Sequence, residues 1–196
     1  MRIADKFTLA RIVLAPVFFV IFFSSEWFGF DLSASVFIMV PLLIFAEFTD
    51  FLDGFFARKL GQVSDFGKLF DPFADVLLHL TTFFCFVLSG YLSPLIFLLI
   101  LYREMSMNFV RMLALKKGVA IGARIGGKLK TVLYVVTGFF FLAIECFKRF
   151  GCDLSSMQSI FGTLGTVLSV LCLLVSYISF IEYLVCFKSV LNIEEV

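Results

Sequence analysis

Residues 50–76 read DFLDGFFARKLGQVSDFGKLFDPFADV, and four aspartates, Asp50, Asp53, Asp71 and Asp75, fall within 26 residues of this stretch. Apolar runs lie directly before and after it. The chain of 196 residues is 61% hydrophobic, contains 29 Phe and is only 16% charged. A soluble domain of this length could not hide so much apolar surface from water, so the composition favours a membrane protein. The carboxylates therefore stand inside a sequence that is otherwise suited to lipid.

Outward from this stretch, polar or glycine-containing turns divide the chain into apolar segments that approach the roughly 20 residues needed to cross a bilayer. The segments are expected at about 8–23, 34–60, 68–88, 94–116, 128–147 and 157–186. We predict an all-α integral membrane protein, a bundle of about six transmembrane helices that forms one domain over residues 1–196. With a net charge of +1, the composition gives no reason to expect nucleic-acid binding.

The 16 Lys and Arg residues are distributed unevenly in this six-span topology. Arg103 falls within the fourth span, and only Lys148 and Arg149 lie on one side of the membrane. The other side holds the remaining 13, which are Arg2, Lys6, Arg11, Arg58, Lys59, Lys68, Arg111, Lys116, Lys117, Arg124, Lys128, Lys130 and Lys188. The positive-inside rule then places both termini, and the aspartates, at the cytoplasmic face.

The aspartates form two helical pairs. Asp50 and Asp53 are three residues apart and Asp71 and Asp75 four, so each pair shares one face of its helix. A short turn joins the two helices, which lets the pairs face each other. A carboxylate inside a membrane helix costs roughly 2.5–3.5 kcal/mol, and divalent cations would offset both this cost and the mutual repulsion. Oxygen ligands suit Mg²⁺ or Mn²⁺. The alternative is that these are solvated helix-end charges, with Asp71 before Pro72 acting as a cap.

The stretch from Asp50 to Arg58 has the pattern Asp-x-x-Asp-Gly-x-x-Ala-Arg. Gly67 follows after eight residues, Asp71 after three more and Asp75 after another three. The whole pattern resembles the signature of the CDP-alcohol phosphotransferases. That resemblance implies a cytoplasm-facing site with two divalent metals that bind the diphosphate of a CDP-linked substrate. It implies that all four aspartates are metal ligands, that Asp75 is the base for the acceptor hydroxyl, and that the enzyme is a homodimer. It also implies a set of residues next to the CDP group, which are Gly54, Ala57, Arg58 and Gly67.

A second basic region covers residues 103–131. Arg103 is predicted to lie in mid-helix, where an unpaired cation is expensive, and the positive-inside bias does not explain it. A positive pocket beside the metal site suits an acceptor that itself carries a phosphate. The segment Arg103-Glu104, Arg111 and GKLKT at 127–131, together with FTLARIVLAPVFF at 7–19, resembles the bacterial phosphatidylglycerophosphate synthase branch of the family.

Enzymes of that branch transfer a phosphatidyl group from CDP-diacylglycerol to glycerol-3-phosphate and release CMP. The resemblance implies a place among the lipids of the bacterial inner membrane. It also implies contacts from this chain to the acceptor phosphate, which are assigned to Arg103, Arg111, Lys128 and Lys130, with Thr8 and Arg11 as further candidates.

Three positions depart from that branch. Asp5 stands where Asn is usual, Val76 stands where Lys commonly follows the last aspartate, and Glu47 replaces a small neutral residue. These departures leave other acceptors open, namely serine, inositol phosphate, or diacylglycerol with a CDP-aminoalcohol. His79, the only histidine, lies one turn beyond Asp75, and either packing in the bundle or a catalytic or metal role would fit it.

Two other classes of protein remain as alternatives. A divalent-cation transporter would also place aspartates inside a membrane, but a conduction path needs polar residues toward the opposite face, where only Glu145 stands out. A purely structural membrane protein would have no need of the signature residues.

Overall fold

The computed structural model describes residues 3–60, 65–119 and 124–187, and within them the side chains of 7–49, 70–119 and 124–187. These residues form helices and no strand. The helices are α1 Ile3–Phe22, α2 Ser24–Phe28, α3 Leu32–Leu60, α4 Asp65–Leu88, α5 Pro94–Lys116, α6 Ile125–Arg149 and α7 Gln158–Cys186, with a 3-10 turn at Ser155–Met157. The six long helices match the six predicted segments, and most begin two to five residues before the predicted start.

The short helix α2 was not predicted from the sequence, and neither was the 3-10 turn before α7. Helix α2 occupies part of the polar segment after α1 and ends at Gly29, which adopts φ +66°. Residues with a side chain rarely adopt this left-handed conformation, so glycine is suited to the end of such a helix. The turn between α4 and α5 uses Gly90 (φ +79°) in the same way, and Pro94 then opens α5.

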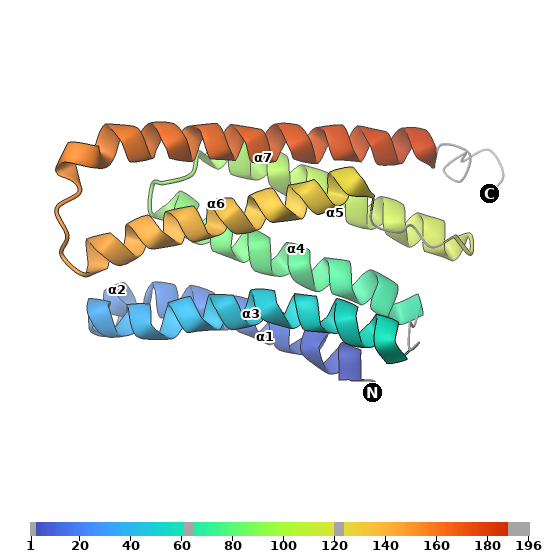
Figure 1. Ribbon diagram of the computed structural model, residues 1–196, viewed down its shortest axis with the longest axis horizontal. Coiled ribbons are helices and arrows are strands. Elements are labelled where there is room, and N and C mark those ends of the chain that lie inside the picture. The colour runs from blue at the N-terminus through green and yellow to red at the C-terminus, as the bar shows by residue number, and fades with distance from the viewer. Residues whose placement is uncertain (1–2, 61–64, 120–123, 188–196) are drawn as a thin grey trace.

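The long helices run alternately in opposite directions (Figure 1). The start of α1, the end of α3, the start of α4 and the end of α7 lie together at one end of the bundle, which we call the aspartate end. The other end, called the far end, holds α2, the turn between α4 and α5, and the connection between α6 and α7. Helix α1 packs along α3 and α4, α7 packs along α6 and α5, and α4 connects the two groups through α5 and α6.

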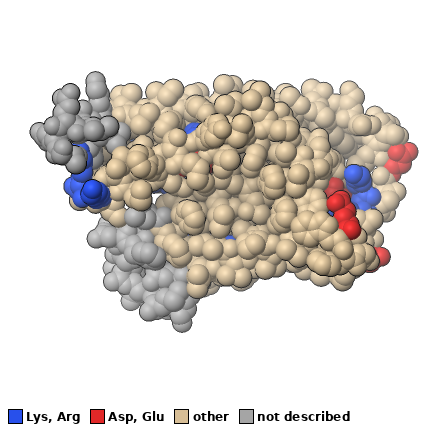
Figure 2. All heavy atoms as spheres, turned by 180° about the vertical axis from the view of Figure 1, so that it is seen from behind, with Lys and Arg blue, Asp and Glu red and all other residues tan. Residues whose placement is uncertain are grey.

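Within the described residues, four helical segments are long and apolar enough to cross a membrane. They are Leu32–Thr49, Phe70–Leu88, Ile125–Arg149 and Ser155–Cys186. Figure 2 shows the middle of one face almost without charged side chains, whereas charged groups gather toward the two ends. The protein is therefore an integral membrane protein. The apolar part of α1, Phe7–Phe22, is shorter, and α5 carries three charged residues in its interior, so the six-span count stays a prediction.

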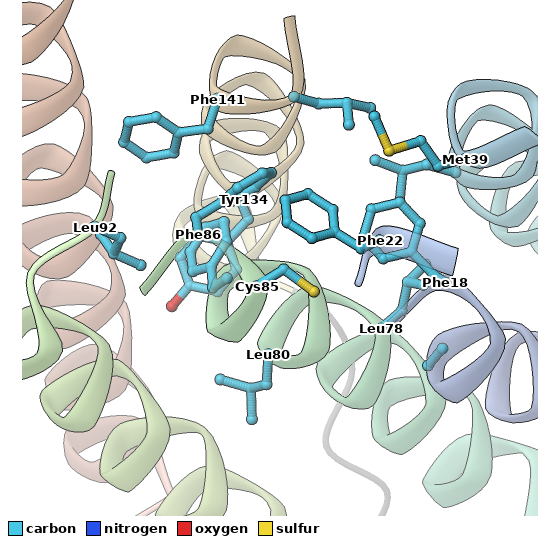
Figure 3. Packing of buried hydrophobic residues seen from close by; sticks show 14 of the residues in the cluster. Phe18, Phe22, Met39, Leu78, Leu80, Cys85, Phe86, Leu92, Tyr134 and Phe141 are labelled. Carbon is cyan, nitrogen blue, oxygen red and sulfur yellow. The ribbon is translucent and has the colours of Figure 1, made fainter. Parts of the chain in front are cut away.

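Aromatic side chains fill the contact between the two helix groups. Phe22 of α1, Phe86 of α4 and Phe141 of α6 are all buried (Figure 3). The ring centroids of Phe86 and Phe141 are 5.4 Å apart, and Tyr91 stacks on Phe141 at 6.1 Å. Lipid is as apolar as these side chains, so close packing, rather than exclusion of water, favours association here.

Candidate functional site

The first half of the aspartate signature lies in the last part of α3, and Gly67 lies in the first turn of α4. The side chains of this group are outside the described residues, so their predicted contacts stay predictions. The group comprises Asp50, Asp53, Gly54, Ala57, Arg58 and Gly67. What the backbone shows is that the end of α3 and the start of α4 lie at the same end of the bundle (Figure 1).

The second aspartate pair is described, and its partners come from α1. Thr8 donates a hydrogen bond from its hydroxyl to Asp71, and the Arg11 guanidinium pairs with Asp75. Both α1 side chains are fully buried. The structure thus places Thr8 and Arg11, which the N-terminal resemblance had added as further candidates, directly against the predicted metal ligands.

The oxygen donors of Asp71 and Asp75 suit a hard divalent cation. They share one face of α4 and lie toward its beginning. Among the described side chains, no group of three acidic, histidine or cysteine residues forms a complete metal site. Asp71 and Asp75 are two of the four predicted ligands, and the other two belong to the part of α3 whose side chains are not described, so the metal site stays a prediction.

Beside Asp75 lies a cavity of about 340 Å³, which we call the acceptor cavity. All four cations that were assigned to the acceptor phosphate line it, from α5 and α6. Its lining residues are Pro72, Asp75, Val76, His79, Arg103, Arg111, Gly127, Lys128, Lys130, Thr131, Val132 and Tyr183. Residues that are up to 111 positions apart in the chain thus meet at one place, within the volume range of small-molecule sites.

Glu104 organises the inner wall of this cavity. Its Oε1 atom accepts hydrogen bonds from Arg103 Nη1, Lys130 Nζ and the Tyr134 hydroxyl, each at 2.9 Å. Arg103 also donates from Nε to the carbonyl oxygen of Ser176 at 2.8 Å. Glu104 is 2% exposed and Arg103 3%. The mid-helix cation that the sequence left unexplained is thus paired, and its neighbour Glu104 is the partner.

The remaining two cations of the cavity are less committed. Arg111 Nε is buried and has no hydrogen-bond partner among the described residues, and Lys128 is exposed. The Arg111 side chain shares a hydrogen bond with Tyr183, and neither Arg111 nor Lys128 is one of the three donors bonded to Glu104 Oε1. Arg111 and Lys128 are therefore the cations best placed to receive an anionic group.

Tyr134 and Tyr183 lie at the site although neither was predicted to belong to it. Tyr134 stands four residues after Lys130 in an apolar helix, so the two side chains lie on the same face. This spacing could have indicated that Tyr134 belongs to the site. Tyr183 accepts a hydrogen bond from the backbone N–H of Arg124 at 2.7 Å, across the 59 residues that separate α7 from the start of α6. No local sequence pattern predicts such a contact.

Close packing of α6 on α7 brings these groups together. A Cβ atom added at Gly127 would lie 3.2 Å from the Tyr183 hydroxyl, and one at Gly126 would lie 3.0 Å from Glu182 Oε2. Arg124 donates to Glu182 at 2.7 Å, a hydrogen bond that raises the pKa of the exposed guanidinium. The two glycines thus let the beginning of α6 approach the last turns of α7.

A larger cavity, of about 560 Å³, opens at the far end of the bundle. Lys148 and Asp153 are its charged lining residues. Asp153 accepts a hydrogen bond from the backbone N–H of Ser155, which lowers the pKa of its carboxyl. None of the predicted site residues lines this cavity, so the smaller acceptor cavity, with its group of charged side chains, is the candidate site.

Close to that far end lies a second buried ion pair. Arg149 binds Glu145 at 2.7 Å, the Ser35 hydroxyl at 2.6 Å and the carbonyl oxygen of Phe22 at 2.7 Å. Tyr91 donates a hydrogen bond to the other oxygen of Glu145 at 2.7 Å. Burial is the main cause that raises the pKa of the Tyr91 phenol, and this hydrogen bond is the next. The pair joins α6 to α1 and α3, which indicates a structural role.

The profile of the CDP-alcohol phosphatidyltransferase family matches residues 1–178. The chain therefore belongs to this family of enzymes, and the assignment made from the aspartate signature is confirmed. It is 39% identical over 173 residues to the CDP-diacylglycerol–glycerol-3-phosphate 3-phosphatidyltransferase of Treponema pallidum (strain Nichols), covering 84% of this chain and 80% of that protein.

Other relatives carry the same or an equivalent name. The chain is 31% identical over 144 residues to the Bacillus subtilis (strain 168) CDP-diacylglycerol–glycerol-3-phosphate 3-phosphatidyltransferase, covering 69% of this chain and 73% of that protein. It is 34% identical over 145 residues to a probable phosphatidylglycerophosphate synthase of Mycobacterium tuberculosis (strain H37Rv), covering 74% of this chain and 68% of that protein.

Proposed function

We propose that the protein transfers a phosphatidyl group from CDP-diacylglycerol to glycerol-3-phosphate, forming phosphatidylglycerophosphate and CMP. The observation that carries this proposal is the gathering of four cations and Asp75 around one cavity. The names of the relatives support the same pair of substrates.

The charge of the cavity favours a phosphorylated acceptor. Four cations face one buried carboxylate, Glu104, while Asp75 is balanced by Arg11. A phosphate monoester carries about −1.5 to −2 charges at neutral pH, which would largely offset this excess. Serine and diacylglycerol bring no phosphate to the cavity, so they are weaker alternatives, whereas inositol phosphate remains the acceptor to compare directly.

Asp75 would take the proton of the reacting hydroxyl, a role supported by its position as a carboxylate at the wall of the acceptor cavity. Arg111 and Lys128 would hold the acceptor phosphate, and Arg103 and Lys130, fixed by Glu104, would form the inner positive wall. Two Mg²⁺ or Mn²⁺ ions held by Asp50, Asp53, Asp71 and Asp75 would stabilise the negative charge that develops on the departing CMP. Gly54, Ala57, Arg58 and Gly67 would lie against the CDP group.

We also propose the membrane orientation and the oligomeric state that were expected from the sequence. The excess of Lys and Arg at the aspartate end supports a protein of the bacterial inner membrane whose aspartate end and both termini face the cytoplasm. There a soluble acceptor can reach the cavity and the lipid substrate can enter from the bilayer. A homodimer is part of the same proposal.

The test is release of CMP by the purified protein with CDP-diacylglycerol, offering glycerol-3-phosphate, serine and inositol phosphate separately. Turnover with glycerol-3-phosphate, its loss with a chelator, and its return with Mg²⁺ or Mn²⁺ are expected. Asp75→Asn should abolish turnover and keep CDP-diacylglycerol binding. Turnover with another acceptor alone would refute the substrate assignment. Divalent-cation flux into liposomes without any CMP release would favour the transporter instead.

A further inference from the structure

The Tyr183 side chain of α7 connects three helices at the wall of the acceptor cavity. Its hydroxyl accepts a hydrogen bond at 2.7 Å from the backbone N–H of Arg124, the N-cap residue of α6. The side chain also shares a hydrogen bond with the Arg111 guanidinium of α5. A guanidinium can only donate, so the Tyr183 oxygen is the acceptor in both bonds. Tyr183 lines the cavity and is 1% exposed, which makes it a buried link between α5, α6 and α7.

This link reaches both of the cations that the proposed function assigns to the acceptor phosphate. Arg111 is bonded to the Tyr183 hydroxyl directly. Lys128 is connected through the backbone, because the Arg124 carbonyl oxygen accepts the Lys128 N–H at 3.0 Å and so closes the first turn of α6. Both cations line the same cavity. One hydroxyl of α7 therefore fixes the Arg111 side chain and the turn that carries Lys128 relative to each other.

The Tyr183 phenol is itself held on two sides. The Phe187 ring stacks on it, with centroids 6.2 Å apart and planes at 15°. A Cβ atom added at Gly127 would lie 3.2 Å from the hydroxyl, so the absence of a side chain at this position lets α6 come close to it. A long, flexible Arg side chain loses rotamer freedom when it binds an anion. A rigid partner that orders the guanidinium beforehand reduces this cost and so favours binding.

We propose that Tyr183 is a positioning residue for a phosphorylated acceptor, whose hydroxyl holds the Arg111 guanidinium and the first turn of α6 in the arrangement that receives the acceptor phosphate. The proposal rests on the proposed function, which assigns that phosphate to Arg111 and Lys128. The phosphate of glycerol-3-phosphate does not react, so its contacts are the same before and during the transfer. Loss of such contacts raises KM and leaves kcat unchanged.

The test is Tyr183→Phe, which keeps the ring and removes only the hydroxyl. In CMP-release kinetics, the KM for glycerol-3-phosphate should rise about tenfold, as expected for one hydrogen bond to a charged group. The kcat and the KM for CDP-diacylglycerol should change by less than about twofold. Because KM does not depend on how much of the preparation is folded, a less stable variant still gives an answer.

Tyr177→Phe is the matched control for a hydroxyl that only fastens helices together. Tyr177 lies on the same helix and donates a hydrogen bond to the Leu99 carbonyl oxygen of α5 at 3.1 Å, but it is not among the residues that line the acceptor cavity. This variant should keep the wild-type KM for glycerol-3-phosphate. An equal rise of KM in both variants would mean that Tyr183 acts only through packing of α7, and would overturn the inference.

A double variant tests whether Tyr183 acts through Arg111. On the Arg111→Gln background, Tyr183→Phe should raise the KM by less than about threefold, because residues that act together are not additive. A full tenfold rise on that background, or an unchanged KM in Tyr183→Phe alone, overturns this inference and leaves the proposed function standing. Wild-type protein that releases no CMP with glycerol-3-phosphate overturns the proposed function, and the inference with it.

Discussion

Glu104→Gln tests whether one buried carboxylate holds the acceptor cavity in shape. The substitution keeps the size of the side chain and an oxygen, but it removes the only anion bonded to Arg103 and Lys130 among the described residues. Removing one partner of a buried ion pair typically costs about 3–5 kcal/mol. We expect a loss of this size in the free energy of unfolding, or roughly 10 °C in Tm for a chain of this length. We also expect the KM for glycerol-3-phosphate to rise at least about tenfold.

Thermal unfolding in detergent and CMP-release kinetics measure the two effects. Glu182→Gln is the matched control, because Glu182 also pairs with an arginine, Arg124. In this pair, however, the side chains are exposed, Arg124 by 41% and Glu182 by 37%. A surface pair contributes at most about 1 kcal/mol, so this variant should resemble wild type in Tm. If Glu104→Gln has the same Tm as the control and keeps the wild-type KM, Glu104 does not hold these cations.

A second substitution separates stability from binding. In Glu104→Gln/Lys130→Met, one of the two unpaired cations is gone, and part of the lost stability should return. The KM for glycerol-3-phosphate should not recover, because a cation of the cavity has been removed. Recovery of both quantities would show that Lys130 has no part in acceptor binding.

Three further substitutions probe other parts of the bundle. Arg111→Gln should raise the KM for glycerol-3-phosphate at least about tenfold, while Lys116→Gln, outside the cavity lining, should leave it unchanged; equal effects would argue for bulk charge. Glu145→Gln should cost about 3–5 kcal/mol of stability without changing KM, since its network lies toward the far end; a raised KM would contradict this. In Gly165→Ala, the new Cβ would lie 2.6 Å from Phe141 Cε1, so overpacking should cost about 1–3 kcal/mol in unfolding experiments. Gly162→Ala on the same helix meets nothing within 4 Å and should be neutral.

The long helices were predictable because lipid imposes a simple rule on the sequence. A spanning helix must be apolar for about 20 residues, so charged and glycine-containing turns mark its ends. The starts of the helices were less accurate, because polar residues such as those before Phe70 in α4 can continue a helix outside the apolar region. Helix α2 escaped prediction since it is one turn long and lies within a polar segment.

The contacts within the site were harder to predict than its residues. The basic residues stood out by their charge, but adjacent residues on a helix do not normally face each other, so their spacing did not predict the pairing of Arg103 with Glu104. The partners of Asp71 and Asp75 come from α1, more than 60 residues earlier in the chain. Only the packing of α1 on α4 brings these side chains together. Nε2 of His79 lies 3.3 Å from Oε1 of Glu47, and this contact likewise depends on how α3 and α4 meet.

The two buried ion networks show how structural and functional charges differ in a membrane bundle. Toward the far end, Arg149 and Glu145 balance each other. Arg149 also donates hydrogen bonds to the Ser35 hydroxyl and to a main-chain carbonyl, and Tyr91 donates one to Glu145. Such a pair is costly to break but leaves no charge over. Around the acceptor cavity, the same kind of carboxylate stabilises Arg103 and Lys130, yet Arg111 and Lys128 add further positive charge. A bundle that needed only stability would have no reason to bear this excess in apolar surroundings. An anionic ligand that enters the cavity would balance it, which is why the imbalance, rather than the presence of buried charge, makes this cavity the candidate site.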